Sequence, residues 1–153
     1  MLTKEPRGKT VLVVESDRSF RELIRDTLTV ADYQVVLTSE GKEALQVAAR
    51  HEYTFDLLLT DLLMPNFYGW DLAELLKLDY PRLKVIYLVT SCSRFQFQTR
   101  EHDYSVAAKT RIFPLCEEDS LVELLKVVED VLSSSDAASG GAPREPSVMK
   151  RIA

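Results

Sequence analysis

Short apolar runs alternate along this chain with longer segments in which apolar residues recur every three or four positions. Continuous aliphatic runs are typical of strands buried on both faces of a parallel sheet, whereas the periodic segments are typical of amphipathic helices. The alternation predicts an α/β fold built from five strand–helix units. The expected strands are residues 10–14, 33–38, 56–60, 84–89 and 109–113.

Local signals predict where the helices begin and end. Asp17 is expected to cap the first helix and Ser39 the second, because both residue types accept hydrogen bonds from the free N–H groups of a first turn. Pro81 is expected to end the third helix. Residues 92–104 are polar and only weakly periodic, and a fourth helix is expected there. The last helix follows Pro114 and carries apolar residues at helical spacing, namely Leu121, Leu124, Leu125, Val128 and Leu132.

The first helix has a charged face as well as an apolar one. Helices of this kind pack the apolar stripe on a sheet and leave the charged side chains in solvent. The residues expected to face solvent are Arg18, Arg21, Glu22, Arg25 and Asp26.

The composition of the chain divides it into three parts. Residues 1–9 form a polar lead, and residues 10–132 contain the five strand–helix units. In residues 133–153, 13 of 21 residues are Ser, Ala, Gly or Pro. Such a segment buries too little apolar surface to fold, so we expect a disordered tail or a linker.

Charge and hydropathy exclude several classes of protein. The net charge of -5 provides no basic field for nonspecific nucleic-acid binding, so no direct nucleic-acid contact is expected. No apolar stretch is long enough to span a membrane, and the first ten residues lack the apolar core of a secretion signal. We therefore expect a cytoplasmic protein that does not bind membranes. Cys92 and Cys116 are too isolated to suggest a metal site or a disulfide.

Polar residues follow several of the expected strands, and parallel strands bring their carboxyl ends to one edge of the sheet. Glu15 or Ser16 follows the first strand, Asp61 the third, and Thr90 the fourth, while Phe113 ends the fifth. Two carboxylates held about 4 Å apart repel by roughly 4 kcal/mol at an effective dielectric constant near 20. A hard divalent cation such as Mg2+ would relieve that repulsion, and a carboxylate beside it could attack phosphorus.

These positions make residues 10–132 resemble the receiver domain of two-component response regulators, the CheY-like family. The shared landmarks, in order along the chain, are Val11-Leu12-Val13-Val14-Glu15, Asp61, Met64-Pro65 with Gly69, Thr90-Ser91, and Pro114. The resemblance implies a (βα)5 flavodoxin-like three-layer sandwich with a five-stranded parallel sheet in the order 2-1-3-4-5.

The resemblance also implies a role for each matching residue. Asp61 would be the phosphoacceptor, and Thr90 would hydrogen-bond the phosphoryl group and relay the switch. Glu15, Asp61 and the backbone carbonyl of Leu63 would bind Mg2+. A histidine kinase or phosphotransfer protein would be the donor. The surface of the fourth helix, fifth strand and fifth helix would bind a downstream protein target, in a signalling module rather than an enzyme.

The chain departs from the family pattern at three positions of the expected site. Ser16 stands where receivers usually carry a second acidic residue, so Mg2+ binding is expected to be weak. Asp17 would replace that acid if the turn were bulged by one residue, but we favour its role as a helix cap. Phe113 stands where receivers carry a lysine, whose charge-assisted hydrogen bond is worth about 1.5 to 3 kcal/mol, or roughly 10- to 150-fold. Thr110 stands in place of an aromatic switch residue.

Two functional hypotheses therefore remain open. The favoured one is a receiver phosphorylated on Asp61. The alternative is a degenerate receiver that binds a partner without phosphate control, as Ser16 and Phe113 suggest. Arg111 would supply the cation that is missing at Phe113 only if its side chain reached the pocket. A haloacid-dehalogenase type hydrolase is disfavoured, because such an enzyme needs an acid at the position of Leu63.

Overall fold

The computed structural model describes residues 8–64, 67–89, 111–114 and 120–133. At its centre lies a five-stranded parallel sheet in the order β2-β1-β3-β6-β7. The two-residue strands β4 and β5 stand outside this sheet, so the order is the expected 2-1-3-4-5. The sheet strands are β1 (Thr10–Val14), β2 (Gln34–Thr38), β3 (Leu57–Asp61), β6 (Lys84–Val89) and β7 (Arg111–Pro114).

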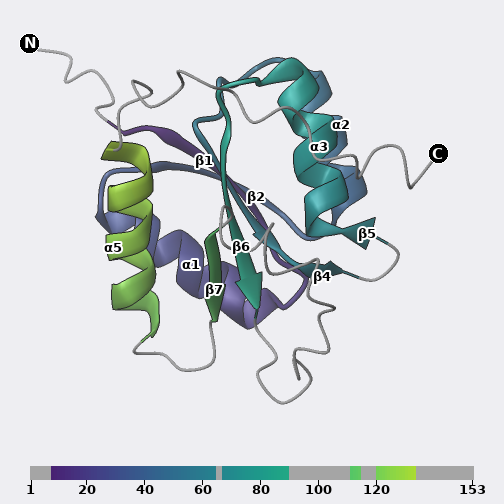
Figure 1. Ribbon diagram of the computed structural model, residues 1–153. Coiled ribbons are helices and arrows are strands. Elements are labelled where there is room, and N and C mark those ends of the chain that lie inside the picture. Colours follow the sequence, from purple (N-terminus) through teal and green to yellow (C-terminus); the bar gives the residue numbers. More distant parts are fainter. Residues whose placement is uncertain (1–7, 65–66, 90–110, 115–119, 134–153) are drawn as a thin grey trace, which may run out of the picture.

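The described helices cover both faces of the sheet. The pair α1 and α5 lies on one face, and the pair α2 and α3 lies on the other (Figure 1). This arrangement confirms the three-layer α/β sandwich. None of the described helices is long and apolar enough to cross a membrane. The helices are α1 (Arg18–Val30), α2 (Gly41–Ala49), α3 (Gly69–Asp79) and α5 (Ser120–Ser133).

Each face of the sheet has its own apolar core. Alternate residues of a strand point to opposite faces, so Val11 and Val13 pack in the core beneath α1 and α5, while Leu12 and Val14 pack in the core beneath α2 and α3. All residues of β1 and β3 are buried. This double burial explains the continuous apolar runs of residues 11–14 in β1 and 57–59 in β3.

One helix cap was predicted correctly and one was not. Asp17 is the N-cap of α1, and its side chain accepts a hydrogen bond from the N–H of Phe20. The N-cap of α2 is Glu40 rather than Ser39. Instead of capping the helix, Ser39 donates its N–H and its hydroxyl to the carboxylate of Glu43, at 3.0 and 2.9 Å. The carboxylate is a stronger acceptor for both groups than the chain's own carbonyls.

The segment after β3 contains a short antiparallel hairpin, which is not among the expected elements. Strand β4 (Leu63–Met64) pairs with β5 (Phe67–Tyr68), and Leu63 lies opposite Tyr68. Two-residue strands are too short to produce an alternating pattern in the sequence. The hairpin leads directly into α3.

Two lysines at the amino end of the sheet hold the last turn of α5. Lys84, the first residue of β6, donates to the carbonyl oxygen of Val131 at 2.8 Å. Lys9, just before β1, donates to that of Leu132 at 3.4 Å. Cations at these carbonyls complement the negative end of the helix dipole.

Several expectations concern residues outside the described part of the chain. They are the helix over 92–104, residues 134–153 of the tail, Thr90, Thr110 and both cysteines.

Candidate functional site

Asp61 is the last residue of β3, the central strand of the sheet. Its side chain is buried, with 6% of the residue exposed. Oδ1 accepts a hydrogen bond from the N–H of Leu63 at 3.3 Å. A carboxylate at the carboxyl end of the central strand stands where open α/β sheets bind their ligands.

Gly69 brings the start of α3 close to Asp61. Its N–H donates to the carbonyl oxygen of Leu62 at 2.9 Å. A Cβ atom at this position would lie 2.6 Å from the carbonyl oxygen of Asp61, which is closer than side-chain carbons approach oxygen. Only glycine therefore permits this approach without a backbone shift.

Glu15 follows β1 on the neighbouring strand and is fully buried. Oε1 accepts a hydrogen bond from the N–H of Asp17 at 2.9 Å. The other oxygen, Oε2, is buried and has no hydrogen-bond partner among the described residues. Buried carboxylate oxygens are costly to leave unpaired, so Oε2 marks a place where a proton or a cation is expected.

Burial raises the pKa of both carboxyl groups. Burial raises the pKa of Glu15 to about 7, and the charge of Asp61 adds to this effect against the hydrogen bond from Asp17. Burial likewise raises the pKa of Asp61 to about 6, against the hydrogen bond from Leu63. Burial thus destabilises the ionised forms of both groups, and the positive charge of Arg21 offsets only part of this effect at Glu15.

The donor set suits Mg2+, with few protein ligands. Glu15 and Asp61 supply carboxylate oxygens, and a Mg2+ ion bound by one or two carboxylates keeps several waters. The unpartnered Oε2 of Glu15 is the observation that fits such an ion. No group of three or more His, Cys, Asp or Glu side chains suited to a metal occurs in the part of the chain that the structure describes.

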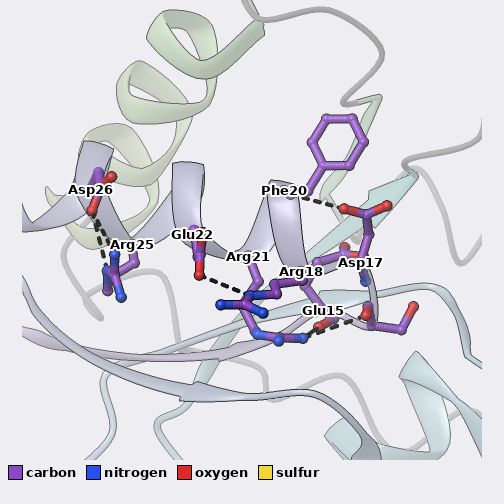
Figure 2. Close-up of polar contacts among 9 residues, drawn as sticks. Glu15, Asp17, Arg18, Phe20, Arg21, Glu22, Arg25 and Asp26 are labelled. Atoms are coloured by element: carbon purple, nitrogen blue, oxygen red, sulfur yellow. Dashed lines mark hydrogen bonds and ion pairs between the residues drawn. The ribbon is translucent and has the colours of Figure 1, made fainter.

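Ser16 supplies no carboxylate to this site, and Asp17 uses one carboxylate oxygen to cap α1. Ser16 is exposed, and the Oδ1 atom of Asp17 accepts the N–H of Phe20 at 3.0 Å (Figure 2). Asp17 serves α1 as its cap, which is the role that the sequence favours for it.

Strand β7 places Phe113 level with Asp61. Leu88 of β6 pairs with Asp61 on one side and with Phe113 on the other. Arg111 pairs with Ile86, two residues further from that edge. The side chains of Phe113 and Arg111 lie outside the described part of the structure, as does Thr90.

One polar residue of this region was missed from the sequence. Arg21, expected in solvent, donates from Nη1 to the carbonyl oxygen of Glu15 at 2.8 Å. The sequence does hold a signal for an unusual charge pattern at this helix end: α1 has no acidic residue in its first turn and begins with Arg18. Cations near a helix N-terminus oppose its dipole, so such residues call for another explanation.

Comparisons with known proteins agree with this geometry. Residues 11–126 match the model of the response regulator receiver domain. The response regulator protein FleR of Pseudomonas aeruginosa is 38% identical over 76 residues, which cover 50% of this chain and 16% of FleR. The chain thus spans about a sixth of that relative's length.

Solved structures share the fold at lower identity. The chemotaxis protein CheY4 of Vibrio cholerae is 23% identical, with a TM-score of 0.64, and the match covers 81% of this chain and 98% of CheY4. The response regulator TrrA of Thermotoga maritima, solved in complex with Mg2+ and beryllium fluoride, is 23% identical with a TM-score of 0.60, covering 80% of this chain and 98% of TrrA.

The match over residues 11–126, together with the sheet order and the carboxylates at its edge, identifies the chain as a member of the response regulator receiver domain family of two-component signalling.

Proposed function

We propose that this chain is a phosphoaccepting receiver, in which a histidine kinase or phosphotransfer protein transfers a phosphoryl group to Asp61. The observation that carries the proposal is the pair of buried carboxylates at one edge of the sheet, Asp61 after β3 and Glu15 after β1. An unpaired buried carboxylate oxygen is a poor structural element but a suitable ligand for a cation.

The proposed chemistry is a simple displacement at phosphorus. A carboxylate oxygen of Asp61 attacks the phosphorus of a phosphohistidine, and the P–O bond forms as the P–N bond breaks. The electron pair of the broken bond remains on the imidazole nitrogen, which takes up a proton. Because the pKa of Asp61 is about 6, its carboxyl group is mostly ionised above neutral pH and is then able to attack phosphorus.

Glu15, Asp61 and the backbone carbonyl of Leu63 are the groups we assign to Mg2+. The ion would supply positive charge opposite the phosphoryl oxygens. We assign to Thr90 the hydrogen bond to the phosphoryl group and the relay of the switch. Exposed Ser16 stands in place of a second acidic ligand, so the affinity for Mg2+ is expected to be low.

The output surface that we propose comprises the helix expected over 92–104, β7 and α5. Phosphorylation would change the affinity of this surface for a downstream protein target. The receiver role is assigned to residues 10–132, with residues 1–9 as a lead and 133–153 as a tail or linker.

A second candidate is a degenerate receiver that binds its partner without phosphorylation. Two observations favour it. Asp17 is engaged in capping α1 through Oδ1, and Phe113 stands level with Asp61 where the family carries a lysine.

Labelling with acetyl phosphate and Mg2+, read by intact mass, separates the two candidates. The wild type should gain one phosphoryl group and Asp61→Asn should gain none. Asp71→Asn, which removes a carboxylate from the first turn of α3, should label like the wild type. The fluorescence of Trp70, the only tryptophan, should change with Mg2+ and beryllium fluoride. A wild type that neither labels nor responds to millimolar Mg2+ would exclude the phosphoacceptor and leave the interaction module.

A further inference from the structure

The turn that joins β1 to α1 is held by a guanidinium group that the proposed phosphoryl transfer does not use. Arg21 donates from Nη1 to the carbonyl oxygen of Glu15 at 2.8 Å and to that of Ser16 at 3.4 Å (Figure 2). Arginine suits this position because its donors are fixed in one plane. One side chain thereby holds the backbone of both residues that follow β1.

The other polar contacts of the turn fix the same segment. The N–H of Asp17 binds Oε1 of Glu15, and the carboxylate of Asp17 binds the N–H of Phe20. These contacts leave Oε2 of Glu15 as the buried oxygen without a partner in the described residues. The orientation of the Glu15 carboxyl group therefore depends on the backbone of this turn, to which Arg21 is hydrogen-bonded.

Arg21 also differs from the other arginines of α1. Arg18 forms an ion pair with Glu22, and Arg25 forms one with Asp26. Arg21 instead binds two carbonyl oxygens and is half-buried, near the helix end where a positive charge opposes the dipole. The guanidinium group of Arg21 is thus bound to the backbone that follows β1 rather than to a surface carboxylate.

We infer that Arg21 is a positioning residue of the site: it holds the Glu15–Ser16 backbone so that the carboxyl group of Glu15 is presented beside Asp61. The inference rests on the proposed function, because the presented oxygen is one of the assigned Mg2+ ligands. Since Ser16 supplies no carboxylate and the carboxylate of Asp17 caps α1, the placement of Glu15 matters more than it would beside a second acidic ligand.

Charge and position predict opposite effects of removing Arg21. Arg21 lowers the pKa of Glu15, so the comparison is made well above pH 7, where Glu15 is ionised with or without Arg21. There Arg21 acts on a cation only by repelling it, so its loss would strengthen Mg2+ binding if charge alone mattered. As a restraint on the turn, its loss would weaken binding. The sign of the change therefore separates a positioning role from a purely electrostatic one.

The test compares Arg21→Ala, Arg21→Lys and the control Arg18→Ala in the full chain. Arg18 is a suitable control because it is exposed and pairs only with Glu22 in the described contacts. Mg2+ affinity is measured by calorimetry, amide exchange of Asp17 is measured by NMR without metal, and the free energy of unfolding is measured in urea.

We expect Arg21→Ala to weaken Mg2+ binding about threefold to tenfold and to speed exchange of the Asp17 amide by a similar factor. This is less than the roughly 10- to 150-fold worth of a charge-assisted hydrogen bond, because Arg21 acts on the site only through the turn. Arg21→Lys should recover part of both, and Arg18→Ala should change neither. Unchanged or stronger Mg2+ binding by Arg21→Ala would overturn the inference, even if stability falls.

Failure of the proposed function gives a different result. If the wild type binds no Mg2+, the proposed Mg2+ site is wrong, and so is the role of Arg21 in positioning it. The Asp17 amide would still report whether Arg21 restrains the turn, so the loss of the proposed function and the loss of the restraint are distinguishable.

Discussion

Gly69 lies against the backbone of Asp61, with room for no side chain between them: a Cβ atom on Gly69 would be 2.6 Å from the carbonyl oxygen of Asp61. The Gly69→Ala variant should therefore shift the start of α3 and destabilise the fold by about 1 to 3 kcal/mol, as for other overpacked positions. Urea denaturation measures this change.

Gly41→Ala is the matched control for that substitution. The added carbon would meet the ring of Phe67 at 2.7 Å, and a half-exposed side chain on a short hairpin yields more easily than backbone. We expect a smaller loss than for Gly69→Ala. Equal losses at the two glycines would contradict a backbone clash at Asp61.

The stability of the protein should depend on pH through its two buried acids. Burial raises the pKa of Glu15 from 4.5 to about 7 and that of Asp61 from 3.8 to about 6. The folded state therefore binds more protons than the unfolded state between these values, and this contribution to stability is lost as pH rises through them.

Glu15→Gln should remove the share of Glu15 in that pH dependence. Above pH 7 we expect the variant to be more stable than the wild type, by on the order of 2 kcal/mol, and the difference should shrink toward pH 4. Urea denaturation across this range measures it, with the exposed Glu22→Gln as control. A difference between wild type and Glu15→Gln that does not vary with pH would contradict the raised pKa.

Asp17 should act on stability rather than on metal binding. Asp17→Ala removes the cap of α1 and should cost about 1 kcal/mol, whereas Asp17→Asn keeps a good cap and should cost little. Neither change should abolish Mg2+ binding by calorimetry. If Asp17→Asn abolished it while retaining full stability, Asp17 would be the missing acidic ligand after all.

Phe113→Lys should strengthen the response to phosphorylation. The strand register places Phe113 level with Asp61 across Leu88, so a lysine at position 113 would occupy the strand position at which receivers carry their lysine. One charge-assisted hydrogen bond implies a gain of roughly 10- to 150-fold in retention of beryllium fluoride. Phe113→Met controls for loss of the ring. Equal retention by the two variants would indicate a more deeply altered pocket.

Much of the fold could be predicted from the sequence because the sheet is buried on both faces. The strand at residues 84–89 was predicted to the residue, since an apolar run with a preceding Pro81 admits few other boundaries. The sheet order came from the family resemblance. The hairpin after Asp61 was not predictable, because strands of two residues are too short to show a periodic pattern in the sequence.

The site was harder to predict than the fold, for a physical reason. Sequence spacing gave the positions of Asp61 and Glu15, but it could not show that Oε2 of Glu15 lacks a partner. Helical periodicity likewise predicted that Arg21 faces solvent. Periodicity shows on which face of a helix a residue lies, but it does not show which atoms a long side chain contacts. Arginine is long enough to return to the preceding turn.

The lysine contacts to the last turn of α5 lie at the end of the sheet opposite the site. Lys9 and Lys84 belong to the amino end of the sheet, whereas Asp61 is at the carboxyl end. Five residues of strand separate the two ends by roughly 17 Å. A partner docked at the carboxyl edge and a module joined to the end of α5 would approach the domain from opposite poles, so both could be engaged at once without competing for the same surface.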